Sequence, residues 1–327
     1  MRSTHSTTAT RWLLVLMLLG VCSSARASTL RSDVLYLLPR EVGQLVYVDL
    51  RETRRSPHYP ALKAQLLPQR FQHLADFLNS IGMNLDQDID WLAWVFVPPD
   101  GQEGERLIGL AEGNFSPERV ERYFRQQKLP VDTYRGQTLF PLGSGIGAED
   151  LFFAFLDSST AAFGTRPSLV LLLETRFGAH ENFFRNEPML ARLEEVNGRA
   201  PVWAVFDEQY TRYTLTQFVP EAARFDDFAR VARRFRQSTL QLHLSRDLRI
   251  DFQTWCQTSL DAQTFSFLIQ TGLFVQRWRL RSENPELSRV LENSEVISLG
   301  DRLQVRVSIA EDELKKLLTR RVFFAQF

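Results

Sequence analysis

The stretch GQLVYVDLRET, residues 43–53, is echoed farther along the chain by RAPVWAVFDE, residues 199–208. Each is a short run of β-branched and aromatic residues that closes on an aspartate, Asp49 or Asp207, and leads into a long amphipathic segment. Such runs predict β-strands followed by helices. The two aspartates stand 158 positions apart. The echo therefore predicts an internal repeat in which each half of the chain builds one α+β unit.

The first half predicts the following elements from its alternation, its prolines and its apolar stripes. They are a strand at 45–50, a helical segment at 60–80 interrupted at Pro68, strands at 91–97 and 106–112, a helix from Pro117, strands at 137–142 and 151–163, and a helix at 167–176.

The second half predicts the same order. Its elements are a strand at 202–207, a long helical segment through 225–235, strands at 239–244 and 248–256, a Phe-rich helix at 259–275, strands at 295–299 and 302–309, and a helix at 311–320.

These elements predict an α+β fold of two similarly ordered lobes, 28–181 and 182–327, each an antiparallel sheet covered by helices. Each half runs strand, helix, strand, strand, helix, strand, strand, helix. The first six elements have the ferredoxin-like order, to which a strand and a helix are added.

Residues 1–27 are expected to be a signal peptide. Arg2 precedes a short apolar run, and Arg11 stands at its start. Ala25-Arg26-Ala27 is a cleavage signal, so the mature chain is expected to start at Ser28. Lipid attachment at Cys22 is the less favoured alternative, because bulky Val21 precedes it. The apolar run is too short for a transmembrane anchor. We therefore expect a periplasmic or secreted protein.

The charge balance argues against nucleic acid as a partner. Loss of the leader removes three arginines and no acid, which leaves 36 basic and 39 acidic side chains. Binding to phosphate backbones needs a basic surface instead. Cys256 is the one cysteine left after cleavage, so we expect no intramolecular disulfide.

Several motifs together resemble a class of uncharacterised secreted bacterial proteins, of the domain-of-unknown-function type, with a repeated α+β unit. They are Leu37-Leu38-Pro39, Val46–Leu50, Ile81-Gly82, Asp88-Ile89-Asp90, Gly113–Val120 and Pro201–Val205. The resemblance implies the fold and the export. It implies no catalytic residues.

We predict no cofactor and no metal site. The glycine-rich stretch 143–147 precedes a strand-like run rather than the helix that a phosphate loop requires. The acidic stretch 86–90 lacks the glycine and glutamate of a calcium loop. The histidines of the mature chain, including His243 on the expected polar side of its strand, form no ligand pair.

No catalytic residues are predicted either. Cys256 ends a strand without a basic neighbour, which is typical of a packed thiol. Asp49 and Asp207 could act as an acid–base pair only if the two halves faced each other, and local turn roles are favoured.

Two segments are candidates for partner contact. In the predicted helix around 224–236, phenylalanines form one side, and Arg230, Arg233 and Arg234 lie on the opposite side. The second segment is the C-terminal end, which contains Phe323, Phe324 and Phe327. We expect a non-enzymatic binding or scaffold module of the bacterial envelope, with another envelope protein as its partner. The first alternative is a carrier for an apolar ligand, suggested by the helix at 259–275. The second is a hydrolase that uses a cleft between the lobes.

Overall fold

A computed structural model describes residues 29–66, 83–98, 106–142, 151–218 and 232–319, together with Asn79 and Gly104. The expected signal peptide, the glycine-rich stretch 143–147 and much of the predicted helix around 224–236 lie outside these residues. Asp86–Asp90, by contrast, is described and forms the short helix α6 and the start of a strand.

The described elements of the first half follow in chain order. They are α2 (Ser32–Leu37), β1 (Gln44–Asp49), α3 (Leu50–Thr53), α4 (Tyr59–Leu66), α6 (Leu85–Asp88), β2 (Ile89–Val97), β3 (Arg106–Gly113), α7 (Pro117–Gln126), β4 (Asp132–Tyr134), β5 (Gln137–Pro141), β6 (Leu151–Phe155), β7 (Thr160–Thr165) and α8 (Arg166–Arg176).

The second half adds a 3-10 turn and a further set of helices and strands. They are η1 (Phe183–Arg185), α9 (Glu187–Val196), β8 (Val202–Phe206), α10 (Glu208–Phe218), β9 (Phe235–Leu244), β10 (Leu248–Cys256), α12 (Ser259–Glu283), α13 (Pro285–Glu292), β11 (Ser294–Leu299), β12 (Arg302–Ile309) and α14 (Glu311–Thr319).

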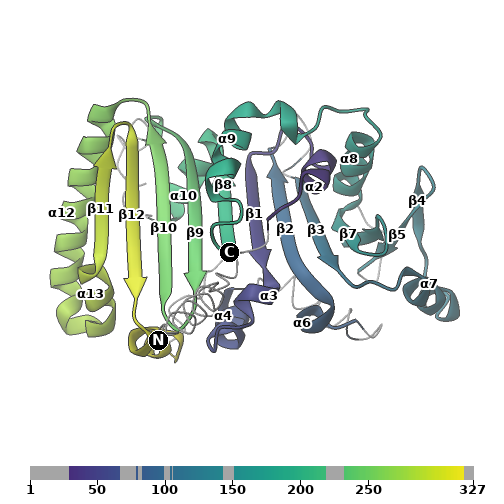
Figure 1. The fold of residues 1–327 in the computed structure, drawn as a ribbon, viewed down its shortest axis with the longest axis horizontal. Coiled ribbons are helices and arrows are strands. Elements are labelled where there is room, and N and C mark those ends of the chain that lie inside the picture. The colour runs from purple at the N-terminus through teal and green to yellow at the C-terminus, as the bar shows by residue number, and fades with distance from the viewer. Residues whose placement is uncertain are drawn as a thin grey trace, which may run out of the picture.

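The strands of both halves form one antiparallel sheet in the order β11-β12-β10-β9-β8-β1-β2-β3-β7-β6-β5-β4 (Figure 1). The predicted α+β class is therefore confirmed. The two echoed strands, β1 and β8, pair with each other at the centre, with Tyr47 opposite Trp203. Outward from this pair the order is β2-β3-β7-β6 on one side and β9-β10-β12-β11 on the other. The halves thus repeat one strand order and continue each other's sheet.

The likeness to a ferredoxin-like unit is limited to the order of elements. In a split βαβ unit a helix connects parallel strands. Here β1 is antiparallel to β2 although α3 and α4 lie between them in sequence, and β8 is antiparallel to β9 in the same way. Each repeat therefore resembles an antiparallel meander, except that its last strand, β7 or β12, lies inside the strand that precedes it in sequence, β6 or β11.

The central aromatic residues form the core where the halves meet. Side chains alternate along β1, so Tyr47 and Val48 point to opposite faces of the sheet, which we call the Tyr47 face and the Val48 face. On the Tyr47 face, the Tyr47 ring stacks on Trp203 with centroids 5.1 Å apart and lies 5.7 Å from Trp91. Helices α2, α8 and α9 cover these rings with Val34, Leu35, Leu169, Leu172, Met189 and Leu193.

The Val48 face of the first repeat is packed with phenylalanine. Phe124 of α7 contacts the ring of Phe140 at 4.9 Å, and Phe140 stacks on Phe153 at 5.2 Å. Gly109 makes room for this layer, because a Cβ at that position would lie 2.0 Å from the ring of Phe163. In the second repeat α12, α13 and α14 cover the same face through Phe265, Val290, Leu314 and Leu317.

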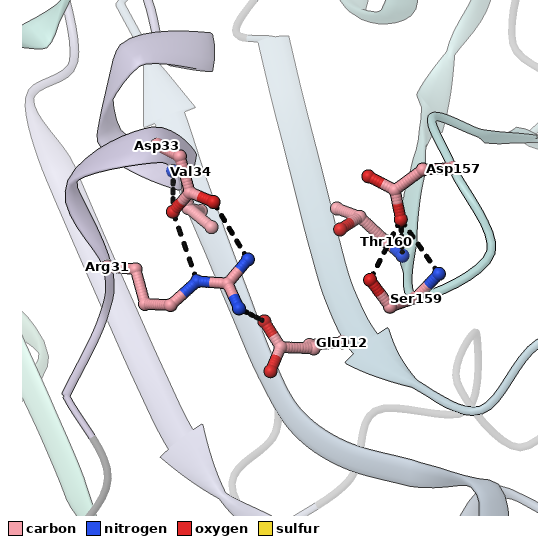
Figure 2. Close-up of polar contacts among 7 residues, drawn as sticks. All are labelled: Arg31, Asp33, Val34, Glu112, Asp157, Ser159 and Thr160. Carbon is pink, nitrogen blue, oxygen red and sulfur yellow. Dashed lines mark hydrogen bonds and ion pairs between the residues drawn. The ribbon is translucent and has the colours of Figure 1, made fainter.

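The single strand predicted at 151–163 is wrong: the chain forms the hairpin β6–β7 there. Asp157 makes the turn, because its Oδ1 accepts hydrogen bonds from the amides of Ser159 and Thr160 and from the Ser159 hydroxyl (Figure 2). Burial raises the pKa of Asp157, but these hydrogen bonds outweigh it and leave the pKa below its usual value. The apolar residues on both sides of Asp157 give a strand-like pattern, so the sequence alone did not reveal a turn made by a single aspartate.

Next to this turn, an ion pair fastens the first described segment to the sheet. Arg31 donates two hydrogen bonds to Asp33, at 3.1 and 2.8 Å, and its Nη1 lies 3.2 Å from Oε2 of Glu112 on β3 (Figure 2). The hydrogen bond from Arg31 holds the pKa of Asp33 below its usual value. Arg31 thus connects Asp33 of the N-terminal segment with Glu112 of the sheet.

The stacked ring at the junction gives the first prediction. Trp203 is fully buried, so Trp203→Ala should lower the free energy of unfolding by about 3–5 kcal/mol. Leu299→Ala, at an exposed position on β11, should change it by less than about 0.5 kcal/mol. Urea denaturation followed by far-UV circular dichroism measures both. Equal effects of the two substitutions would contradict a core at the β1–β8 junction.

Candidate binding surfaces

The Tyr47 face of the second repeat carries a polar surface where the first repeat has its core. On β3 and β7 the equivalent positions are apolar, for example Leu110 and Ala162, and α8 covers them. On β9, β10, β11 and β12 no described helix lies in front of the outer strands (Figure 1). We call this surface the open face. Its residues are Gln241, His243, Arg249, Asp251, Gln253, Glu295, Ile297, Leu299, Gln304 and Arg306.

A network of paired charges occupies the centre of the open face. The Asp251 carboxylate, 8% exposed, accepts hydrogen bonds from Nε of Arg249 at 2.9 Å and from Nε of Arg306 at 2.8 Å. Arg306 also donates through Nη1 to Glu295 at 3.1 Å. The hydrogen bond to Asp251 raises the pKa of Arg306. The network therefore holds two guanidinium groups in place on the surface of the sheet.

His243 lies beside this network, as expected for the polar side of its strand. Its Nε2 is 4.0 Å from Oδ2 of Asp251. Burial, followed by the positive charge of Arg249, lowers the pKa of His243 below its ordinary value. The lowered pKa favours the neutral imidazole, which can both donate and accept a hydrogen bond.

Two arginines and a tryptophan form the border between the open face and α9. The guanidinium carbon of Arg192 lies 4.0 Å from the centroid of the Trp255 ring, and that of Arg302 lies 4.8 Å from it. Glu195 joins the two arginines, at 2.7 Å from Arg192 and 3.3 Å from Arg302. These cation–π contacts keep both arginines against the sheet.

A groove of about 380 Å³ runs along the other end of the open face. Its lining mixes polar and apolar groups: His243, Ser245, Asp247, Leu248, Arg249, Asn293, Ser308, Ile309 and Ala310. Toward the sheet edge, the open face ends in two apolar side chains of β11, Ile297 and Leu299, which are 46% and 79% exposed. The surface thus combines a charged centre, a groove and an apolar margin.

Helix α12 presents a second, entirely different surface. Its inner side packs Ala262, Phe265 and Ile269 on the sheet. Its outer side carries large apolar residues that are 54–73% exposed: Leu260, Phe267, Leu268, Phe274, Val275 and Trp278. We call these six residues the α12 stripe. The predicted helix at 259–275 is therefore confirmed and extends to Glu283, and its surplus apolar side chains face outward.

The predicted partner contacts are only partly described. Arg233 and Arg234 are exposed just before β9, and Nη1 of Arg234 lies 3.6 Å from Oδ1 of Asp261 in the first turn of α12. Arg230, Phe323, Phe324 and Phe327 lie outside the described residues. Neither described arginine belongs to the open face.

The two echoed aspartates do not come together. Because β1 and β8 are antiparallel, Asp49 lies beside Pro201 and Asp207 lies beside Gly43, about 20 Å apart along the strands. Each has a local role: Asp49 accepts from the amide of Glu52, and Asp207 accepts from that of Tyr210. Burial raises the pKa of Asp207. They cannot serve as one acid–base pair.

The described residues also form a small apolar pocket, and they allow a search for metal sites and membrane spans. One apolar cavity between β2, β3, β6 and β7 measures about 40 Å³, enough for about one water molecule. Within the described ranges, no three His, Cys, Asp or Glu side chains are placed to hold a metal ion. In the same ranges, no helix is both long and apolar enough to cross a bilayer.

Comparisons with known proteins add little about function. No protein-family model matches the chain, and no curated protein does. Among solved structures, crystal forms I and IV of TP0453 are similar. Each is 10% identical in sequence, with a TM-score of 0.49, over 92% of this chain and 100% and 99% of theirs. At this identity neither structure tells what this protein binds.

The sequence does contain a signal for the open face. Polar residues alternate with apolar ones through Arg249, Asp251 and Gln253 and again through Arg302, Gln304 and Arg306. This pattern predicts two strands with one solvated side. Their lateral pairing, which brings Arg306 onto Asp251, depends on a register that the pattern alone leaves open.

The charge network gives a second prediction. Asp251→Ala should lower the free energy of unfolding by about 2 kcal/mol, because it removes the shared acceptor of two guanidinium groups. Glu295→Gln is the control: Glu295 is exposed and forms a surface ion pair with Arg306, so the loss of its charge should cost less than about 1 kcal/mol. Urea denaturation at pH 7 measures both. An Asp251→Ala protein as stable as the wild type would contradict the organising role of Asp251.

The buried thiol of Cys256 gives a third prediction. It is fully buried between α12 and the sheet, and burial raises its pKa to about 12. At pH 8 only about one thiol in ten thousand is then ionised. The folded protein should react with Ellman's reagent at least about a hundredfold more slowly than a urea-unfolded sample. Equal rates would show that Cys256 is accessible.

Proposed function

We propose that this protein is an exported, non-enzymatic binding module of the bacterial envelope that holds another protein on its open face. One observation carries the proposal. Two repeats share one strand order, yet the face that is an apolar, helix-covered core in the first repeat is polar on β10, β12 and β11 in the second, where no described helix covers it. A sheet face that is solvated beside such a core is available for a partner.

The chemistry of the open face favours a protein partner. Arg249, Arg302 and Arg306 are each matched by a nearby carboxylate, so the surface lacks the net positive charge that nucleic acids require. Arginine is enriched in protein interfaces, and the exposed side chains of Ile297 and Leu299 add apolar area at the margin. The amides of Gln241, Gln253 and Gln304 add groups that both donate and accept hydrogen bonds.

The arrangement also favours specific recognition over indiscriminate adhesion. Arg306 is fixed by Asp251 and Glu295 before a partner arrives, so less side-chain entropy is lost on binding. A partner must then match a fixed pattern of charges, which discriminates between partners more strongly than apolar area does.

The two alternatives have less support. A carrier needs an enclosed apolar space, and the cavity described above has room for about one water molecule. A hydrolase built on Asp49 and Asp207 requires carboxylates that meet, whereas these lie at opposite ends of the central strands. Export itself rests on the leader at 1–27, with cleavage after Ala27 favoured over lipid attachment at Cys22.

The proposal predicts site-specific cross-linking in living cells. A photoreactive residue in place of Gln253 or Gln304, both half-buried on the open face, should yield one discrete adduct with a second envelope protein. The same residue in place of Arg119, exposed on α7, should not. Leu299→Asp, at the apolar margin, should reduce the adduct at least about tenfold, because a charge replaces apolar contact. Immunoblotting and mass spectrometry identify the adduct. The absence of a discrete adduct from both positions would overturn the proposal.

A further inference from the structure

The exposed side of α12 contains a line of residues with the spacing of a helix-pairing seam. Leu260, Thr264, Phe267, Thr271, Phe274 and Trp278 follow one another at alternating intervals of four and three residues. This is the a/d spacing of coiled coils, which keeps one line of side chains toward a partner helix. The seam spans about 27 Å of the helix. All six positions are exposed, so the seam has no partner among the described residues.

No charged residue interrupts the middle of α12. Between Asp261 and Arg277 the helix contains apolar residues, threonine, serine, glutamine and Gly272. Gly272 lies in the exposed part of the helix, and an added Cβ there would meet nothing within 4 Å. A glycine inside a helix costs about 1 kcal/mol relative to alanine. The described residues therefore give no packing reason for a glycine at this position.

We propose that α12 pairs with the α12 of a second copy of this chain, antiparallel, about a two-fold axis near Ile269. Antiparallel pairing sets each large residue of the seam against a complementary position. Phe267 meets Thr271 of the second copy, Phe274 meets its Thr264, and Leu260 meets its Trp278. The two inner pairs set a phenylalanine against a threonine, which lets the helices approach closely, and the outer pair buries two large apolar side chains against each other.

Charge favours this direction of pairing. Arg277, Arg279 and Arg281 cluster at the C-terminal end of α12, and Asp261 lies at its N-terminal end. Arg279 and Arg281 have acidic partners, so a parallel pair would chiefly place the Arg277 side chains of the two copies at the same level, which is repulsive. An antiparallel pair sets each cluster beside the end that carries Asp261 and aligns the two helix dipoles favourably.

The same charges favour a protein copy over a lipid surface. Arg279 lies 3.9 Å from Glu283, and Arg281 lies 3.7 Å from Glu292 of α13. Two of the three arginines are thus matched by acids. A helix that lies on an anionic membrane instead carries unmatched basic residues along its polar side.

The exposed area is of the size that a dimer needs. The three aromatic residues of the stripe alone offer about 400 Å² per copy. Leu260, Leu268 and Val275 bring the stripe near the ~800 Å² per partner of a standard interface. Helix α12 forms one end of the molecule, outside β11 (Figure 1), so two copies can meet there without contact between their open faces. The inference is independent of the proposed function.

Cross-linking by position tests the pairing and its direction. Leu268 lies next to the proposed axis, so Leu268→Cys should be joined to its second copy by a short bis-maleimide in high yield. Leu260→Cys, at a position that is even more exposed, lies about 27 Å from its own counterpart in an antiparallel pair and should give at least about tenfold less dimer. The wild-type chain controls for its own cysteines. Equal yields from Leu268→Cys and Leu260→Cys would overturn the antiparallel arrangement.

Sedimentation equilibrium of the same purified protein tests association itself. The wild type should dimerise, and Phe267→Asp should raise the dissociation constant at least about thirtyfold, because it buries a charge in the seam. Gln263→Asp, on the same helix but outside the seam, should leave it within about threefold. Unchanged circular dichroism shows that the variants fold. A wild type that stays monomeric, or whose α12 stripe is protected only by phosphatidylglycerol vesicles, would overturn the proposal.

Discussion

The antiparallel contact between β1 and β8 is the interaction on which the rest of the structure depends. It joins segments 158 residues apart, stacks Tyr47 on Trp203, and extends at both ends through the amides of Asp49 and Asp207, which donate to Pro201 and Gly43. Without it, each repeat would expose its first strand as an unpaired edge, which invites aggregation. With it, two modest sheets become one sheet with a shared central core.

The repeat accounts for the single antiparallel sheet, and the differences between the two repeats account for the open face. After β7 the chain turns into α8, which covers the Tyr47 face with four buried leucines. After β12 it turns into α14, which packs with α13 and Leu62 of α4 instead. The strands match this difference: apolar residues point to the Tyr47 face in the first repeat, and Arg249, Asp251 and Arg306 point to it in the second. Helix placement and strand composition therefore agree.

The open face and the α12 stripe have opposite physical characters. On the open face a buried carboxylate needs its two guanidinium partners, since an uncompensated buried charge is costly. That requirement holds Arg249 and Arg306 in position and makes the surface selective by charge. The α12 stripe offers area and shape without charge, and its driving force is burial. We therefore propose a particular partner for the first surface and a copy of the same chain for the second.

Alternation and periodicity in the sequence determined the α+β class, the repeated order of elements and most strand positions, because they are local consequences of which side chains must be buried. They also determined that Asp49 and Asp207 have local roles, and that His243 lies on a polar side. The hairpin at Asp157 escaped prediction, since a single side chain made the turn within an apolar run. The fusion of both halves into one sheet, the meeting of Arg306 with Asp251, and the outward direction of the α12 stripe were decided only by the tertiary structure. Each depends on which distant strand or helix lies alongside, and pairing across long sequence separations leaves no mark in any local pattern.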